Sequence, residues 1–444
     1  MNPCVFVIFS LLLLHAETII SDQLGGGDDN GVIMRKCSDK ERRALLDFKA
    51  RLQDPDETLS TWRAEEEEEE DCCKWRGVTC NNQTHHVTGL DVDRLGLVGE
   101  ISNSLLNLSS LNHLDLSYNS FHGTISTFIG SMTRLRHLDL GWNQFNGIIP
   151  RSIGSLTELT SLDLSYNSFY GTIPPEFGNL TNLQYLYLRD VGRCRVENLD
   201  WLSHLSHLVH LEMDGTSLAK QNYWLDVILS LRKLSWLSLD GCELSQVMYP
   251  YSSSFLNSSS SISFLSLRNN NLTSSMYRWL FPLTNNQLHL LDLSSNMLDG
   301  TPKYLGNLCS LEYFAFDNNS VVIKFPDFLN NLSSGCTSLT LQGLFAGHNR
   351  FIGTLSNEIL TFKNLSILDM SSCSLGPRFP KWIQKIKNLT SLEIPLSYCQ
   401  QWNFRHDSSG VLGHVAFSIN ISQSLFQQLQ WESTRFIIKF WQQF

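Results

Sequence analysis

The feature that most constrains the fold of this chain is a repeat of about 25 residues that runs through most of its length. In residues 111–119, LNHLDLSYN, leucines stand at offsets 0, 3 and 5 and an asparagine stands at offset 8. The pattern begins thirteen times, at Val87, Leu111, Leu135, Leu159, Leu183, Leu208, Leu234, Ile262, Leu288, Leu311, Leu341, Leu365 and Leu389. A unit this short cannot bury a core alone, so neighbouring copies must stack and share one.

Each copy predicts one short strand and one return segment. Side chains alternate along a strand, so offsets 3 and 5 face the core and offsets 2, 4 and 6 face outward. The offset 8 amide can satisfy backbone groups where the chain turns inward, and it recurs as Asn119, Asn143, Asn167, Asn270, Asn296 and Asn319. The repeat therefore predicts a solenoid in which successive strands pair into one parallel sheet over a continuous core.

Several copies depart from asparagine at offset 8. Cys242 and Cys373 stand there, and we interpret both as buried free thiols. Val191 and Thr216 occupy the same offset in two consecutive copies, where we expect an irregular coil.

A second pattern follows offset 8, as in residues 147–150, GIIP, and residues 171–174, GTIP. The copy at residues 159–182 reads LTSLDLSYNSFYGTIPPEFGNLTN, which is similar almost throughout to the plant-specific class of leucine-rich repeats. The resemblance covers about residues 37 to 395. It implies an α/β solenoid, a right-handed leucine-rich-repeat superhelix with a parallel, concave β-sheet, opened by an N-terminal helical disulfide cap.

Residues 22–85 are predicted to form this cap. Ser38 and Glu41 have the spacing of a capping box, and Leu45 and Phe48 follow on one helical face, with Leu52 one turn further on. Two tryptophans, Trp62 and Trp75, are candidates to plug the first coil. The run from Glu65 to Glu70, which supplies six of the ten net negative charges, is expected to be a solvated loop.

The cysteines fit this cap. Residues 71–80, DCCKWRGVTC, resemble the cap motif of the plant family, and the resemblance implies bridges from Cys37 to Cys72 and from Cys73 to Cys80. Sequence alone leaves the pairing of Cys37 with Cys73 open. Cys309 and Cys336 flank the long copy at Leu311 and are a candidate bridge, whereas Cys194 and Cys399 have no evident partner.

The N-terminus predicts secretion. An apolar stretch from Val5 to Leu14, followed by Ala16, indicates a signal peptide over residues 1–21. No apolar run reaches 18 residues, so we expect no membrane span in this chain. Ten glycosylation sequons agree with an extracellular or plasma-membrane location: Asn82, Asn107, Asn179, Asn257, Asn271, Asn318, Asn331, Asn364, Asn388 and Asn420.

The sequence contains no catalytic signature, so we expect no enzyme, no cofactor and no metal site. The net charge of −10 also argues against nucleic acid as a partner. His204, His207 and His210 have a spacing that suggests metal ligands, but the repeat frame puts the first two on the convex side and the third on a strand. The pair His85 and His86 is interpreted as lying on the surface.

The outward positions of the concave sheet are the candidate ligand-binding surface. The candidates are His113, His137, Tyr185, His210, Trp236, Phe264 and Tyr313 at offset 2, and Tyr187 at offset 4. The stretch from Tyr185 to Tyr313 departs from the repeat template and supplies large contact area at low ordering cost. The column of aspartates at offset 4, Asp91, Asp115, Asp139, Asp163 and Asp292, belongs to the template itself.

Two further motifs narrow the resemblance. Residues 198–208, NLDWLSHLSHL, and residues 375–383, LGPRFPKWI, are similar to plant receptor-like proteins of the type that recognises fungal xylanase. This resemblance implies an extracellular module that recognises a protein or peptide ligand in defence. It also implies a membrane anchor, a short cytosolic tail and a partner receptor kinase.

The repeats, predicted over residues 86–395, give way to a divergent tail over residues 396–444 without a cap or a span. We expect either a truncated or mis-joined gene copy or a soluble form with an unusual tail. A secreted inhibitor of fungal wall-degrading enzymes or a soluble decoy receptor is the alternative function. The sequence does not separate a defence receptor from a developmental co-receptor of the same architecture.

Overall fold

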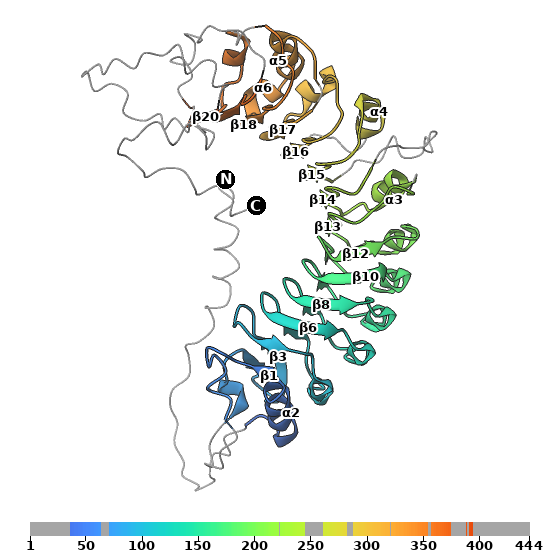
Figure 1. Cartoon of the computed structure of the whole chain (residues 1–444), viewed down its shortest axis with the longest axis vertical. Coiled ribbons are helices and arrows are strands. Elements are labelled where there is room, and N and C mark those ends of the chain that lie inside the picture. Colours follow the sequence, from blue (N-terminus) through green and yellow to red (C-terminus); the bar gives the residue numbers. More distant parts are fainter. Residues whose placement is uncertain are drawn as a thin grey trace, which may run out of the picture. The chain divides into compact units, whose positions relative to one another are not determined.

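The computed structural model describes residues 36–63, 71–221, 223–244, 261–281, 287–319, 321–353, 357–373, 388 and 390–393. In this part of the chain, the successive copies lie side by side as coils. Each coil contributes one strand to a long sheet, and the return segments carry short helices on the other side (Figure 1). The solenoid predicted from the repeat is confirmed.

The long sheet has fourteen strands among the described residues. In sheet order they are β2 (Val78–Cys80), β3 (Val87–Asp91), β5 (His113–Asp115), β7 (His137–Asp139), β9 (Ser161–Asp163), β11 (Tyr185–Tyr187), β13 (His210–Glu212), β14 (Trp236–Ser238), β15 (Phe264–Ser266), β16 (Leu290–Asp292), β17 (Tyr313–Ala315), β18 (Gly343–Phe345), β19 (Ile367–Asp369) and β20 (Ser391–Glu393). From β3 onward the strands are parallel and pair equal offsets, so His113 lies opposite His137 and Asp139 lies opposite Asp163. The repeat frame therefore fixes which side chains are neighbours across the sheet.

A second sheet flanks the first coils. Its strands are β1 (Leu52–Gln53), β4 (Val98–Gly99), β6 (Ser120–Thr124), β8 (Gln144–Gly147), β10 (Ser168–Thr172) and β12 (Gly192–Arg195). The glycine of the second sequence pattern lies at the end of β8, where Gly147 has a φ of 80° and a Cβ would lie 2.7 Å from the Thr124 side chain. Only glycine fits this position without strain.

The cap and the return segments contain the helices. The α-helices are α2 (Asp39–Lys49), α3 (Trp224–Ser230), α4 (Tyr277–Leu280), α5 (Phe325–Ser333) and α6 (Thr337–Thr340). The 3₁₀ helices span Cys72–Lys74, Asn103–Asn107, Thr127–Ser131, Arg151–Ser155, Pro175–Asn179, Asp200–His204, Ser274–Met276, Lys303–Asn307 and Asn357–Thr361.

One continuous core runs through the coils. The leucines at offset 3, such as Leu114, Leu138 and Leu162, have no exposed surface. Phenylalanines ten residues into successive copies stack nearly parallel, with 6.2 Å between the ring centroids of Phe121 and Phe145. Because each ring packs between its neighbours, the core is continuous from coil to coil.

The asparagine ladder forms as predicted. The Nδ2 group of Asn167 donates to two carbonyl oxygens of its own copy and one of the preceding copy, at 3.0 to 3.1 Å. Its Oδ1 accepts the backbone amide of Phe145 at 3.0 Å. Asn349, at offset 8 of the copy that begins at Leu341, makes the same hydrogen bonds, although it was not among the asparagines predicted to form the ladder. The amide of Asn167 thus satisfies four backbone groups that the turn would leave unpaired.

The cysteines at the ladder offset are buried free thiols, as predicted. The Sγ atom of Cys242 donates to the carbonyl of Met213 at 3.3 Å, and that of Cys373 donates to the carbonyl of Ala346 at 3.4 Å. In the coils of Val191 and Thr216 the strands β11 and β13 keep their register. The change in these coils falls in the return segment, where β12 is the last strand of the second sheet and α3 takes the place of a 3₁₀ helix.

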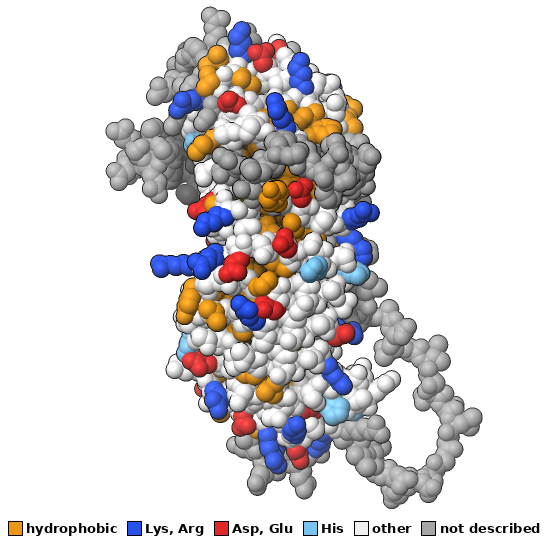
Figure 2. Space-filling view, turned by 90° about the vertical axis from the view of Figure 1, so that its right-hand side faces the viewer, with side chains coloured by type: hydrophobic (Ala, Val, Ile, Leu, Met, Phe, Trp, Pro, Cys, Tyr) orange, Lys and Arg blue, Asp and Glu red, His pale blue; other side chains and the backbone are white. Residues whose placement is uncertain are grey.

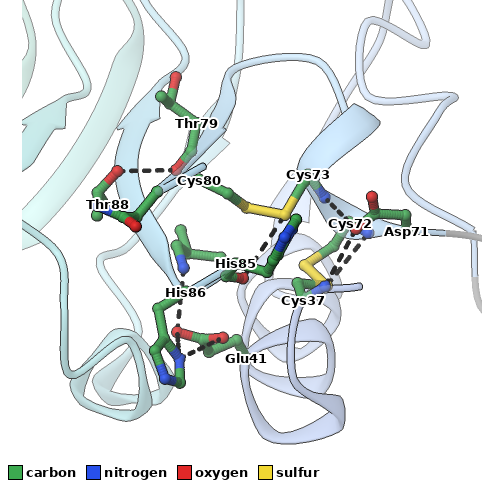
Figure 3. Close-up of a disulfide and its surroundings, with 12 residues drawn as sticks. Cys37, Glu41, Asp71, Cys72, Cys73, Thr79, Cys80, His85, His86 and Thr88 are labelled. Atoms are coloured by element: carbon green, nitrogen blue, oxygen red, sulfur yellow. Dashed lines mark hydrogen bonds and ion pairs between the residues drawn. A yellow bond between two sulfur atoms is a disulfide. The ribbon is translucent and has the colours of Figure 1, made fainter. Parts of the chain in front are cut away.

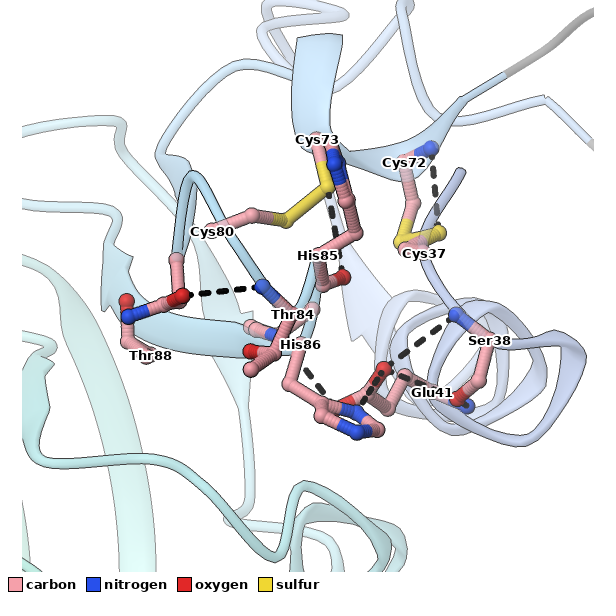
Figure 4. A network of polar contacts seen from close by, with 12 residues as sticks. Cys37, Ser38, Glu41, Cys72, Cys73, Cys80, Thr84, His85, His86 and Thr88 are labelled. Carbon is pink, nitrogen blue, oxygen red and sulfur yellow. Dashed lines mark hydrogen bonds and ion pairs between the residues drawn. A yellow bond between two sulfur atoms is a disulfide. The ribbon is translucent and has the colours of Figure 1, made fainter. Parts of the chain in front are cut away.

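The N-terminal cap closes the first coil. Ser38 and Glu41 form both hydrogen bonds of the predicted capping box at the start of α2 (Figure 4). Trp62 and Trp75 are buried and stack with 5.7 Å between their ring centroids. Phe48 of α2 stacks on Phe121 of the core at 6.2 Å, so the cap packs directly on the repeat array.

Two disulfides hold the cap. Cys37 is bonded to Cys72 and Cys73 to Cys80, the pairing that the resemblance implied (Figure 3). Cys309 is bonded to Cys336 across the long copy, and Cys194 is a buried free thiol. Cys399 and the run from Glu65 to Glu70 lie outside the described residues.

Of the pair interpreted as lying on the surface, His85 is half-buried and His86 is exposed, with 49 % of its side chain accessible, but His86 also contacts the cap helix. Its Nδ1 lies 3.3 Å from both carboxylate oxygens of Glu41, and only 3 % of the Glu41 side chain is exposed. The same carboxylate accepts the amide of Val87 at 3.1 Å. The repeat pattern begins only at residue 87, so no repeat position predicts this contact.

The side of the molecule that carries the helices shows charges of both signs scattered over its surface (Figure 2). In the described part of the chain, no helix is long and apolar enough to cross a membrane.

Candidate ligand-binding face

Five of the predicted residues form one row across four adjacent strands. Tyr185 and Tyr187 of β11 flank His210 of β13, whose ring centroid lies 4.6 Å from that of Tyr187. His210 stacks on Trp236 of β14 at 5.0 Å, and Trp236 stacks on Phe264 of β15 at 3.5 Å. We call these five residues the aromatic row. The equal register of the strands places them side by side.

A group of charges lies beside this row. His210 Nε2 lies 2.8 Å from a carboxylate oxygen of Glu212, which also faces Arg189 at 3.9 Å. Arg189 Nε donates to the buried carboxylate of Asp214 at 2.6 Å. Asp214 Oδ1 accepts the Ser238 hydroxyl at 2.7 Å. These contacts hold the charged side chains in place before any ligand arrives.

The aspartate column is partly desolvated. Burial and the charge of Asp163 raise the pKa of Asp139 to about 7, against the hydrogen bond from the amide of Gly141. Burial raises the pKa of Asp163 to about 6 against the hydrogen bonds from Ser165. The outward face of β7 and β9 therefore carries carboxyls that titrate near neutral pH.

The other predicted residues lie apart from the aromatic row. Tyr313 of β17 is separated from Phe264 by Leu290 of β16 and packs over Gly343. His113 and His137 stack on each other at 4.4 Å between ring centroids. Ser161 of β9 separates this pair from Tyr185.

The histidines differ in their neighbours. His207 Nδ1 lies 3.1 Å from the carbonyl oxygen of Thr181, whereas His210 faces Glu212 on the sheet. The ligand atoms of His113, His137 and Asp115 do converge, all within 4.8 Å of one another. The three residues occupy offsets 2 and 4 of consecutive copies, so the repeat makes them neighbours, although the sequence was not expected to contain a metal site.

A second aromatic stack was missed by the sequence analysis. Tyr118, Trp142 and Tyr166 stand at offset 7, with ring centroids 5.1 and 3.8 Å apart in turn. Arg94 covers the Tyr118 ring at 4.3 Å. The signal was an aromatic residue directly before the ladder asparagine in three consecutive copies.

The predicted glycosylation sites are mostly exposed. Asn331 is half-buried, Asn257 and Asn420 lie outside the described residues, and the exposed asparagines are Asn82, Asn107, Asn179, Asn271, Asn318, Asn364 and Asn388. Asn271 and Asn318 line a polar hollow together with Asn269 and His348. N-linked glycans on Asn271 and Asn318 would therefore lie beside the asparagine ladder.

Comparison with known families gives two matches. The model described as leucine rich repeat N-terminal domain matches residues 38–81, and the model described as leucine-rich repeat region matches residues 90–327. Receptor-like protein EIX1 of Solanum lycopersicum is 33% identical over 330 residues, which are 70% of this chain and 28% of EIX1. Receptor-like protein EIX2 of the same plant is 42% identical over 132 residues, which are 27% of this chain and 12% of EIX2. The chain thus spans little more than a quarter of EIX1.

Solved structures show the same architecture. The crystal structure of PEPR1–AtPEP1 has 25% identity and a TM-score of 0.58, covering 81% of this chain and 50% of that one. The plant peptide hormone receptor RGFR1 in complex with RGF2 has 25% identity and a TM-score of 0.55, covering 74% and 55% of the two chains.

Proposed function

Since this chain belongs to the leucine-rich-repeat family, we propose that it is the extracellular ligand-recognition module of a plant receptor-like protein that acts in defence. Its ligand is a protein or peptide that binds on the concave sheet, and its signal passes through a partner receptor kinase. The similarity to EIX1 and the peptide complex of RGFR1 support this proposal. Residues 1–21 direct the chain into the secretory pathway.

The observation that carries the proposal is the aromatic row. Aromatic side chains contribute large contact area for few rotatable bonds, and they dominate the binding energy of many interfaces. In the row, neighbouring rings and the ion pairs beside His210 fix the side chains. A ligand therefore pays little conformational entropy to order them.

The charges beside the row indicate the ligand chemistry. Asp163 and Glu212 face outward on β9 and β13, on either side of Tyr187. An extended segment with an apolar side chain over Trp236 and Phe264 would place a neighbouring lysine or arginine close to these carboxylates. The favoured ligand is thus a segment in which an apolar residue stands close to a basic one.

The full chain should be secreted from plant cells and used to select binders from a displayed library of random linear peptides. Calorimetry then compares each selected peptide on wild-type protein and on Trp236→Ser and Phe264→Ser. Serine occupies the equivalent position at Ser161, so the fold accepts it. We expect binding to weaken by about tenfold or more, as for a central interface residue.

Tyr170→Ser is the matched control, because Tyr170 is an exposed aromatic on β10 of the other sheet. The control should leave affinity unchanged. Peptides that bind Trp236→Ser as tightly as wild-type protein, or a library that yields no binder, would contradict the proposed role of the row. A mass shift on endoglycosidase treatment of the secreted chain tests its route through the secretory pathway.

A further inference from the structure

We propose that His113, Asp115 and His137 form a binding site for one Zn²⁺ ion on the concave face, separate from the aromatic row. Neither the family resemblance nor the proposed ligand recognition requires such a site. Its three side chains come from β5 and β7, whereas the aromatic row begins at β11 beyond the intervening strand β9.

The sheet register builds the site. His113 and His137 are directly opposed on neighbouring parallel strands, and Asp115 lies two residues beyond His113 on the same face. Their ligand atoms all lie within 4.8 Å of one another. Tetrahedral coordination at about 2.0–2.1 Å brings donor atoms to about 3.4 Å, so the side chains must close by roughly an ångström. All three side chains are half-buried at the sheet surface.

The backbone fixes the carboxylate of this site. Asp115 Oδ1 accepts the backbone amide of Ser117 at 2.9 Å, which holds the carboxylate on the sheet face. The rings of His113 and His137 stack with 4.4 Å between their centroids and 9° between their planes, so one ring must turn before a nitrogen of each faces the same ion.

The donor set selects the ion. Two imidazole nitrogens and one carboxylate are ligands typical of Zn²⁺, whereas Mg²⁺ and Ca²⁺ prefer oxygen ligands throughout. Three protein ligands leave a fourth position, which a water molecule or a donor from a bound partner can take. The register also places Asp91 and Asp139 on either side of Asp115, so further carboxyl groups lie beside the site.

Titration of the full chain with ZnCl₂ in excess MgCl₂, followed by calorimetry, tests the site directly. We expect one Zn²⁺ per chain at this site and an affinity loss of at least about tenfold in His113→Asn, His137→Gln and Asp115→Asn. The double variant His204→Gln/His207→Gln removes two exposed histidines elsewhere and should bind as wild type does.

Co²⁺ provides a readout that does not depend on the variants being stable. Wild-type protein loaded with Co²⁺ should show the visible d–d absorption of a four-coordinate site, and excess Zn²⁺ should abolish it. The proposal is overturned if His137→Gln binds Zn²⁺ as tightly as wild type. It is equally overturned if the His204→Gln/His207→Gln variant accounts for the loss, or if the Co²⁺ spectrum remains that of the hydrated ion.

Discussion

The carboxylate of Glu41 accepts the backbone amide of Val87 across 46 residues of sequence, at 3.1 Å. Glu41 lies in the first turn of the cap helix α2, and Val87 opens the first strand of the repeat array. One buried side chain thus joins the cap to the solenoid, and it also accepts from Ser38 and contacts His86.

Replacement of Glu41 by alanine should destabilise the cap. The change leaves the buried amide of Val87 without its acceptor and removes the reciprocal half of the capping box. We expect a loss of about 2 kcal/mol, as for one unsatisfied buried donor. Thermal unfolding measures this loss, with Asp47→Ala, an exposed change on the same helix, as the control. Equal melting temperatures for the two variants would contradict the role of Glu41.

The second prediction concerns the asparagine ladder, whose side chains should stabilise the fold. Asn167→Ala leaves four backbone groups without a partner, so we expect a loss of about 3 kcal/mol. Asn167→Cys should lose less, because Cys242 shows that a thiol at this offset still donates to one carbonyl. Denaturant unfolding ranks the variants, with the exposed Asn146→Ala as control. An alanine variant as stable as the cysteine variant would refute the ranking.

The ion pair between Arg189 and Asp214 predicts that substitutions at these two residues have coupled effects on the free energy of unfolding. Arg189→Met removes the cation that lies 2.6 Å from a carboxylate with 6 % exposure, so the charge of Asp214 is left buried and unpaired. We expect a loss of roughly 2 kcal/mol, and Asp214→Asn in the same chain should recover part of it, because Oδ1 still accepts from Ser238. A double-mutant cycle in thermal unfolding measures the coupling, and additive effects of the two changes would rule it out.

The repeat made much of this structure predictable. Its period fixes strand register and core at once, because a residue at offset 3 of one copy must pack on offset 3 of the next, as Leu114 does on Leu138. The capping box at Ser38 and the free thiol at Cys242 followed from local patterns.

What escaped prediction depends on side-chain conformation. Arg189 and Asp214 occupy offset 6 of consecutive copies, so the frame makes them neighbours but does not say that they form an ion pair. The same holds for the ligand atoms of His113 and His137, which converge only through their rotamers. His86 lies before the first copy, where no frame exists, and its contact with Glu41 is wholly tertiary.

The raised pKa values on the concave face predict a pH-dependent stability. Burial raises the pKa to about 7 for Asp139 and Asp240 and to about 6 for Asp163. Between the ordinary value and these raised values, the folded state binds more protons than the unfolded state. This contribution to stability is therefore complete below about pH 4 and is lost as the pH rises through about 6 to 7.

Neutral variants isolate this contribution from other titrating groups. Asp139→Asn and Asp163→Asn remove the buried negative charge, and asparagine keeps an oxygen that can accept the amides of Gly141 and Ser165. We expect both variants to melt at higher temperature than wild type near pH 8 and close to wild type near pH 4. Asp91→Asn, an exposed aspartate at the same offset, is the control. If Asp139→Asn lowered the melting temperature near pH 8, the carboxylate would be stabilising in its charged form and the assigned direction of its pKa shift would be wrong.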